Sequence, residues 1–586
     1  MMLFTKTKTK QSGNVTLSAV PICSYNRHEV EGCWVGPVHR KHSNFLLQLS
    51  LAVLLLVSAS GCSNTAYLSK GEKLYTGADL NVQEKGDIPD EGDLKEQLEN
   101  VMVPDPNSKL LGLFRFKLWL YNIGIFKESM GEPPVLLQNV APDRVATRMR
   151  TLLENKGYFQ AEVNYAIQEE EKTGEVQYNV QIHSPYTIAN IIVEGDDSPV
   201  MNAIRSTMNE TSIRVGDPYD LTKLQQERIR IDGELKNEGF FYFSPENIVF
   251  QADSSVGNRQ VDLLLKLKSR TPDEATRIYT IGNVYIYSGY ALNRDSIAIP
   301  AGDTTIVNGY YYIDLDKKFE PDVILRSVFF VKGFPYTRHD HDQTLNRLMN
   351  LGVFKFVNVR FVEADSTGTP RLDAHIYLTP LLMKTIRFEL QGVSKSNNLA
   401  GPVFDSSFRN RNLLHGAELF KLSLNAGFET SIRGTQSGGS SYEIGTRAEL
   451  EFPKFLMPFS LGDDSSGFVP KTRIMLGLRL LHRLQYYQMF SIDAAFGYNW
   501  KESLSKEHSL DPISVTFAHL TKTTDKFKEL LNSNPFLRKS FEEQFIIGQT
   551  YSFTYNDQLE KDKKNHLYFK GSVDFSGSLI HLVQGI

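Results

Sequence analysis

The chain has 586 residues, and its 64 Lys and Arg nearly balance its 68 Asp and Glu, giving a formal net charge of −4. This length is enough for several domains, and a charge so close to zero implies no polyanionic partner, which argues against nucleic-acid binding. The 26 Tyr and 36 Phe against 3 Trp favour β-rich structure. All three cysteines, Cys23, Cys33 and Cys62, lie near the start of the sequence, so a disulfide framework in the body of the protein is excluded.

Residues 1–61 contain an N-terminal extension and the features of a secretion signal. A basic cluster at His39–His42 is followed by the apolar run Phe45–Val57 and by the small residues Ala59–Gly61. A buried anchor helix is the alternative, but the run is shorter than the roughly 20 apolar residues that a membrane-spanning helix needs. Because the small residues end on Cys62, the segment resembles a bacterial lipoprotein signal, in which that cysteine is acylated. The resemblance predicts lipid attachment at Cys62.

One helix-containing unit recurs three times along the middle of the chain. Its clearest copy begins at the turn Gly216-Asp217-Pro218-Tyr219, continues into a helix capped by Asp220, and ends at Gly239, where glycine suits a left-handed C-cap. A repeat of this size indicates an array of small domains. The corresponding copies begin at Gly131 with Pro133 and at Gly333 with Pro335, and they end at Gly157 and Gly352.

A second element recurs between these copies and sets the expected domain boundaries. Tyr186–Ile191 matches Tyr279–Val284, and a fainter copy lies at Thr385–Phe388. A three-stranded sheet with helices on one face would leave open strand edges that can pair with an extended partner chain. We expect a tether over 62–77, a possible divergent first domain over 78–131, and three domains over 132–186, 187–271 and 278–380, each reading strand, helical region, strand, strand.

Together, the Gly-x-Pro-Tyr turn, the helix, its Asn-x-Gly ending and the two closing strands resemble polypeptide-transport-associated (POTRA) domains in series, as in the BamA/TamA outer-membrane assembly factors. Each helix ending alone is a weak signal, since glycine before an aromatic residue is a common C-cap. Three such endings in order, followed by the sequence described next, form a strong signal.

From Lys384 onward the sequence changes to long runs in which apolar and polar residues alternate. Runs of about 10 residues with one apolar and one polar face are typical of a transmembrane β-barrel. A soluble sandwich is the alternative, but its strands are usually about 5 to 6 residues long. Since no apolar run after residue 62 is long enough for a spanning helix, a barrel is the only membrane-spanning structure available here. The clearest runs are Glu418–Glu429, Tyr442–Phe452 and Phe490–Lys501, with others at Ile474–Leu480, Phe545–Tyr555 and Leu567–Phe575.

About eight strands can be counted from Thr385, with a helical insertion at Thr523–Phe541. The run Phe408–Glu418 resembles the start-of-barrel signature of the same family, whose barrel has twice as many strands. With Cys62, the chain over residues 45–586 most resembles the lipoprotein branch, the TamL-type translocation and assembly module. We expect an α+β array of β-α-α-β-β repeats followed, over 384–586, by the N-terminal half of a transmembrane antiparallel β-barrel, and we expect a fragment of a longer chain.

Little in the sequence suggests catalysis. The run Arg338–Asp342 contains two histidines and two aspartates at the start of an expected helix, but His339 and His341 are two apart and would point to different sides, so a shared metal is not expected. No nucleophile elbow, phosphate-binding loop or Cys-x-x-Cys is present. We therefore expect no enzymatic activity, no cofactor and no metal, with a surface enzyme or metal-binding protein as the competing interpretation.

The resemblance implies a bacterial outer-membrane protein whose array faces the periplasm and whose barrel contacts outer-membrane lipid. Its expected partners are unfolded outer-membrane or secreted proteins and a TamB-like protein that spans the periplasm. Substrate strands would add at the first barrel strand, at Thr385, Ile386, Arg387, Phe388, Glu389 and Leu390. The alternative is a two-partner-type secretion pore for one dedicated exported protein.

Overall fold

The computed structural model describes residues 65, 67–86, 88–110, 114–122, 130–290, 304–314, 316–364, 368, 370–395, 399–431, 440–457, 467–558 and 565–577. The three cysteines lie outside these residues, so lipid attachment at Cys62 stays a prediction. The described residues form two compact units. One comprises the part up to Gln83 with Asp90–Arg150 and Glu162–Gln181, and the other comprises Glu84–Pro89, Thr151–Ala161 and the part from Ile182 onward.

The first sheet has the order β1-β3-β2 and consists of β1 (Leu74–Lys85), β2 (Glu162–Glu169) and β3 (Thr173–His183). Val176, Tyr178 and Val180 of β3 are buried at every second position, as a sheet with one covered face requires. Residues 78–131 therefore form no separate domain ahead of 132–186, because β1 belongs to the same sheet as β2 and β3. Between β1 and β2 lie α2 (Glu91–Asn100), α3 (Phe116–Asn122), η1 (Leu137–Asn139) and α4 (Pro142–Asn155).

The second sheet has the order β4-β6-β5 and follows the β-α-α-β-β sequence expected of each repeat. The side chain of Asp220 accepts hydrogen bonds from the amides of Thr222 and Lys223, which caps the longer helix as predicted. Its elements are β4 (Thr187–Glu194), α5 (Pro199–Thr207), η2 (Met208–Glu210), α6 (Leu221–Asn237), η3 (Pro245–Asn247), β5 (Ile248–Asp253) and β6 (Gln260–Leu267).

The third sheet has five strands rather than the expected three, in the order β10-β11-β7-β9-β8. A short hairpin, β8 with β9, is inserted after β7 and adds to the β7 side of the sheet. The elements after η4 (Asp273–Thr276) are β7 (Thr280–Tyr287), β8 (Thr304–Val307), β9 (Tyr310–Ile313), α7 (Pro321–Leu325), α8 (Arg338–Asn350), β10 (Phe354–Ala364) and β11 (Arg371–Pro380).

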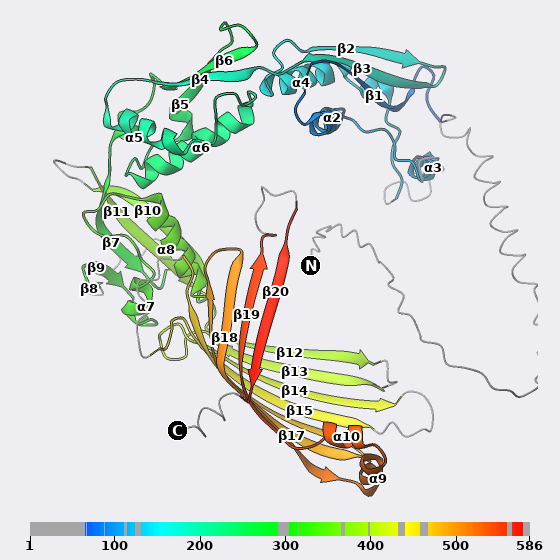
Figure 1. Ribbon diagram of the computed structural model, residues 1–586, viewed down its shortest axis with the longest axis vertical. Coiled ribbons are helices and arrows are strands. Elements are labelled where there is room, and N and C mark those ends of the chain that lie inside the picture. Colours follow the sequence, from blue (N-terminus) through cyan, green and yellow to red (C-terminus); the bar gives the residue numbers. More distant parts are fainter. Residues whose placement is uncertain are drawn as a thin grey trace, which may run out of the picture. The chain divides into compact units, whose positions relative to one another are not determined.

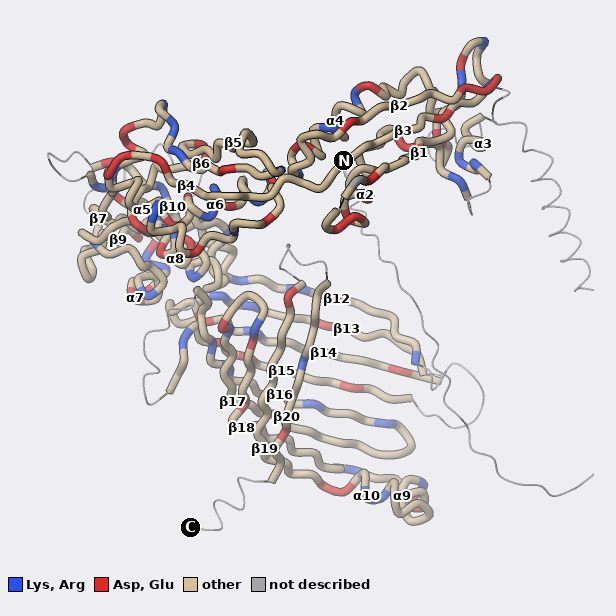
Figure 2. Tube along the Cα trace, turned by 45° about the horizontal axis from the view of Figure 1, so that its top comes forward, with Lys and Arg blue, Asp and Glu red and all other residues tan. Residues whose placement is uncertain are grey.

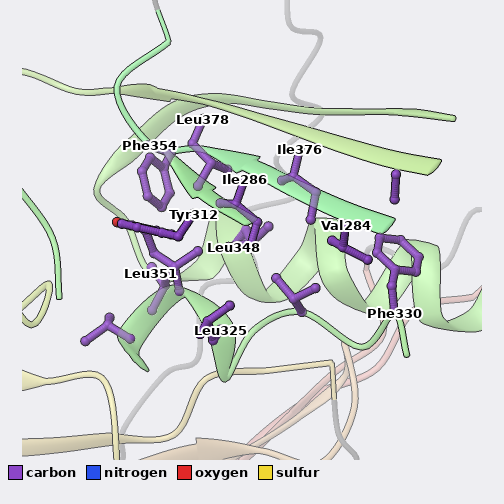
Figure 3. Close-up of a cluster of buried hydrophobic side chains, with 14 of the residues drawn as sticks. Val284, Ile286, Tyr312, Leu325, Phe330, Leu348, Leu351, Phe354, Ile376 and Leu378 are labelled. Atoms are coloured by element: carbon purple, nitrogen blue, oxygen red, sulfur yellow. The ribbon is translucent and has the colours of Figure 1, made fainter. Parts of the chain in front are cut away.

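Helices α7 and α8 cover one face of this third sheet. Ile286 and Ile376 point from neighbouring strands toward Leu348 of α8, and all three side chains have no exposed surface (Figure 3). This cluster forms the core of the third repeat.

From Lys384 the chain forms one antiparallel sheet of nine strands within the described residues, one more than the sequence suggested. Pro512 interrupts the alternation in β18, and the pairing with β19 continues past it through an irregularity between Asp511 and Ser514. Figure 1 shows that the sheet twists, so that β12 and β20 run in different directions. The strands are β12 (Lys384–Ser394), β13 (Leu399–Asn410), β14 (Leu419–Ser431), β15 (Ser441–Phe452), β16 (Lys471–Arg483), β17 (Tyr487–Lys501), β18 (Lys506–Thr523), β19 (Gln544–Asn556) and β20 (Tyr568–Ser576).

The helical insertion lies where the sequence predicts it, between β18 and β19. It consists of α9 (Asp525–Ser533) and α10 (Pro535–Ser540). Within the described residues, no helix is both long and apolar enough to cross a membrane.

The recurring sequence motifs meet at joints beside the second and third sheets. At the first joint, the amide of Tyr186 donates to the carbonyl of Gly157 at 2.9 Å, and the amide of Tyr219 donates to the carbonyl of Tyr186 at 2.8 Å. The ring of Phe159 packs on both tyrosines, with ring centroids 5.0 and 5.1 Å apart. Gly216 adds a bond from its amide to the carbonyl of Ile188.

The second joint repeats the same bonds. The amide of Tyr279 donates to the carbonyl of Gly239 at 2.9 Å, and the amide of Tyr336 donates to the carbonyl of Tyr279 at 2.9 Å. The amide of Gly333 bonds the carbonyl of Ile281. The helix-ending glycine, the Tyr-Thr-Ile strand start and the Gly-x-Pro-Tyr turn therefore recur together because they form one joint.

In the first repeat, the predicted turn residues Gly131 and Pro133 do not hold the corresponding position. The isolated bridges Thr187–Pro218 and Thr280–Pro335 have their counterpart at Leu74–Leu136. The counterpart of the turn proline is thus Leu136, three residues after Pro133. Matching on the Gly-x-Pro pattern selected a different residue, since the pairing depends on backbone groups.

Replacing Gly239 by alanine should destabilise the second joint by roughly 1 to 3 kcal/mol. Gly239 has φ +100°, and an added Cβ would lie 2.8 Å from Cγ2 of Ile278 and 3.3 Å from the carbonyl oxygen of Tyr279. Hydrogen exchange of the α6 amides in the full chain measures the effect. The control is Gly233→Ala in the middle of α6, where a Cβ meets open space and should stabilise the helix by about 1 kcal/mol. Equal exchange rates in the two variants would contradict the prediction.

His341 lies among the aromatic side chains of the third repeat. Its ring centroid is 5.4 Å from that of Phe361 at an interplanar angle of 90°, and its Nδ1 is 3.5 Å from the hydroxyl of Tyr336. Burial lowers the pKa of His341, and Arg338 acts in the same direction while Asp342 opposes it. The folded protein therefore favours the neutral ring.

Because the pKa of His341 is depressed on folding, its contribution to stability is complete above the unfolded pKa of about 6.5 and is lost as pH falls through the folded pKa. We expect the thermal unfolding temperature of the third repeat to fall between about pH 7.5 and about pH 5. His341→Phe should reduce this slope, whereas His339→Gln, at an exposed position, should leave it unchanged. The same slope in wild type and His341→Phe would show that other groups set it.

Candidate functional site

The predicted pairing residues Thr385–Leu390 all lie on β12, at one edge of the nine-stranded sheet. Within the described part of the chain, β12 pairs with β13 alone, and its opposite side faces no neighbouring strand. The pairing with β13 runs without interruption from Lys384 with Asn410 to Ser394 with Ala400. β12 is thus a long, regular edge strand, which is the kind of edge that can template the addition of another strand.

The two faces of β12 differ sharply in chemistry. Ile386, Phe388 and Leu390 alternate along one face and are 61%, 69% and 75% exposed. On the other face, Glu389 accepts hydrogen bonds from Arg387 and from Gln391, both at 2.7 Å. The structure therefore divides the six candidate residues into an apolar set and a polar set.

Strand register extends the apolar face across the sheet. Side chains of directly opposed residues lie on the same face, so a row of register partners shows what each face carries. Figure 2 shows few charged positions along these strands compared with the α/β repeats that precede them in the sequence. One row on the apolar face runs Phe388, Ser406, Leu424, Thr446, Leu478, Ile492, Phe517 and Phe545 from β12 to β19.

Ion pairs occupy the opposite face. Nη2 of Arg473 lies 2.9 Å from Oδ2 of Asp511, and Lys471 lies 3.5 Å from Glu451. Thr516 donates to Asp493 at 3.2 Å. A face that carries paired charges belongs in contact with water.

The turn between β13 and β14 attaches the sheet to the third repeat. The side chain of Asn412 donates to the carbonyl of Lys318 at 2.6 Å, and the amide of Glu320 donates to the carbonyl of His415 at 2.9 Å. Ala417 of this turn is buried in the hydrophobic core of the third repeat. The start of β12 is therefore held by a second part of the chain as well as by its covalent link to β11.

Glu418 shapes this turn from within. Its carboxylate is buried and accepts hydrogen bonds from the amides of Leu414 and Gly416, at 3.1 and 3.0 Å. His415 and Ala417 have φ of 68° and 61°, a left-handed conformation that costs roughly 1 to 3 kcal/mol for residues other than glycine. Sequence reasoning noticed the run Phe408–Glu418 only as a family signature and missed this role of Glu418.

Other predicted site residues lie away from β12. Gly157, Gly216, Pro218, Gly239, Gly333 and Pro335 belong to the two joints, and Gly352 lies in the turn after α8 with φ +71°. In the candidate metal cluster, His339 is exposed and bonds Gln343, whereas His341 packs among aromatic rings. The two histidines therefore face different surroundings. In the residues that the structure describes, no group of three or more His, Cys, Asp or Glu could hold a metal ion.

No protein-family model and no curated protein matches the chain. Among solved structures it is similar to BamA from Haemophilus ducreyi lacking POTRA domains 1–3, with 12% identity, a TM-score of 0.38, and coverage of 67% of this chain and 64% of that one. CdiB from Acinetobacter baumannii matches with 11% identity, a TM-score of 0.34, and coverage of 67% and 61%. The POTRA3–5 region of BamA from Haemophilus influenzae matches with 13% identity, a TM-score of 0.28, and coverage of 54% and 100%.

These matches concern fold alone, since every identity is low and every TM-score quoted is below 0.5. The chain also spans only 64% of the Haemophilus ducreyi BamA chain. We therefore assign function from the chain's own residues. The chain itself consists of mixed α/β repeats followed by one antiparallel sheet of long strands.

Proposed function

We propose that this chain is a non-enzymatic outer-membrane assembly factor, in which an incoming polypeptide adds as a strand to the edge of β12. The observation that supports this most directly is the edge of β12, which no other described strand covers, beside the exposed apolar side chains of Ile386, Phe388 and Leu390. The N-terminal anchor at Cys62, the TamB-like partner and membership of the lipoprotein branch come from the resemblance and are part of the same proposal.

The apolar face of the sheet is the first step of the argument. Fully burying one large aliphatic or aromatic side chain is worth roughly 1.5 to 3 kcal/mol. Three such side chains on β12 alone are more than half exposed, and the rows across the sheet repeat the pattern. A lipid environment would remove this exposure, which supports a membrane location for the sheet.

The free edge is the second step. In hydrocarbon, each unpaired backbone amide or carbonyl costs several kcal/mol. A strand that pairs with β12 satisfies these groups on both chains, and its own apolar side chains enter lipid at the same time. Strand addition therefore has its own driving force, and no nucleotide or other cofactor is needed.

The soluble repeats supply further edges. In the second sheet, β4 and β5 each pair with β6 alone among the described strands. In the third sheet, the inserted hairpin leaves β8 and β10 as the edges. Extended substrate segments can pair with such edges on the periplasmic side before they reach β12.

A dedicated two-partner-type secretion pore is the second candidate. The ion-paired face that includes Arg473 and Asp511 would line an aqueous channel if further strands closed the sheet. Both functions use the same fold, so they differ in the number of client proteins.

Depleting the protein from its own cells should lower the amounts of many outer-membrane β-barrel proteins if the proposal is correct. Quantitative proteomics of isolated outer membranes provides the measurement, with inner-membrane proteins as the internal control. Loss of a single exported protein would favour the secretion pore. An unchanged outer-membrane proteome would exclude both functions.

Cysteines placed on β12 should form disulfides with cysteines in a substrate strand that pairs with it. The three native cysteines all precede residue 63, so cysteines on β12 are new to this part of the chain. We expect crosslinks at Thr385→Cys, Arg387→Cys and Glu389→Cys. Their substrate partners should be spaced two residues apart, because residues on one face of a strand repeat with period two. Ser407→Cys and Ser423→Cys face the same side from the interior strands β13 and β14 and serve as controls. Crosslinking at the controls as strong as on β12 would rule out addition at this edge.

A further inference from the structure

A cleft of about 880 Å³ lies where the third repeat continues into β12. Its walls come from five places: the residues after β7, the loop before α7, the start of β10, the linker from β11 into β12, and the turn after β13. Lys318, Lys355 and Arg411 line it together with Asp316 and the linker residues Leu381–Met383. The volume is typical of a site for a small molecule or the headgroup of a larger one.

The charged lining of this cleft is mainly positive. Among the described lining residues, three side chains are cationic and one, Asp316, is anionic. Lys318 lies 2.7 Å from Asp316, whereas the ammonium of Lys355 lies 5.2 Å from the ring centroid of Phe356. The cleft thus has a surplus of positive charge that suits an anion.

Arg411 is fixed in place on this wall. Its Nη1 donates to the carbonyl of Leu382 and to the hydroxyl of Thr385, both at 3.0 Å. Two neutral acceptors hold the guanidinium without cancelling its charge. A planar, oriented guanidinium is well suited to the oxygens of a phosphate group.

An apolar surface begins at the same cleft. Leu382, in the wall of the cleft, is 82% exposed. Ile386 and Phe388, which are also exposed, follow on the first half of β12. A ligand that matches both features has an anionic head and a hydrocarbon tail. Inorganic phosphate would use the cationic side chains but not the apolar surface.

We propose that this cleft binds the phosphate headgroup of an anionic membrane lipid, with its acyl chains along Leu382 and the apolar side of β12. Lys318, Lys355 and Arg411 contact the phosphate region, and the lipid occupies the rim of the sheet next to the third repeat. The inference rests on the proposed placement of the apolar face in lipid, and it does not depend on substrate assembly.

The test measures binding of phosphatidylglycerol to the full chain in detergent micelles by native mass spectrometry. Each lysine near a membrane surface contributes about a fivefold change in affinity for anionic lipid, so Lys318→Ala/Lys355→Ala should bind about 25-fold more weakly. Arg411 is left intact because it also holds the linker. The matched control is Lys526→Ala/Lys528→Ala on α9, which removes the same charge at the opposite ends of the strands and should leave binding unchanged.

A second arm separates lipid from free phosphate. Leu382→Asn should weaken phosphatidylglycerol binding several-fold while leaving any binding of inorganic phosphate unchanged, since only the lipid contacts this side chain. Circular dichroism confirms that each variant folds; all the substituted side chains are exposed or partly exposed. Equal lipid binding by wild type and the double lysine variant would overturn the proposal, as would inorganic phosphate binding as sensitive to Leu382→Asn as the lipid. An outer-membrane proteome that stays unchanged on depletion, together with lipid binding by the wild-type chain, would refute the proposed function alone.

Discussion

Constant strand register from β12 to β17 is the constraint on which the large sheet depends. From β12 to β17 each strand opposes the next residue by residue, with gaps only between β13 and β14, so every side chain keeps its face. A slip of one residue at any of these pairs would turn one strand's apolar side chains to the ion-paired face. Both chemical properties of the sheet, an apolar face and an ion-paired face, follow from this single geometric condition.

Register also explains which features could be predicted from the sequence. A period of two is a local property, so the long strands, the helical insertion and the cap at Asp220 were predictable from neighbouring residues. Features that depend on distant partners were not. β1 joins a sheet whose other strands begin about eighty residues later, β8 and β9 are four residues each, and Pro133 looked like Pro218 although Leu136 makes the equivalent bridge. At the candidate site, the alternation on β12 predicted its two faces, but nothing local reveals that Glu418 organises the turn that docks onto the third repeat.

Contacts run in series from the second repeat to the sheet. Arg338 of α8 lies 3.4 Å from the buried carboxylate of Asp232 in α6, and the side chain of Asn237 accepts from the amide of His339. The third repeat in turn holds the turn at Ala417, and Arg347 donates to the carbonyl of Phe468, which precedes β16. These contacts, an ion pair with one buried carboxylate, hydrogen bonds made by side chains, and apolar packing, connect the second and third repeats to the start of the sheet.

The position of the cationic cleft gives this coupling a chemical consequence. The cleft and the free edge share the first residues of β12: Thr385 lines the cleft, is bonded by Arg411, and also begins the edge strand. A strand adding along β12 would place its own side chains beside Ile386 and Phe388, next to the acyl chains of a bound lipid. The bound lipid would then lie on the apolar face and the incoming strand at the edge, both next to the start of β12. The start of β12 is thus the point at which attachment to the array, contact with lipid and access to the edge would be linked.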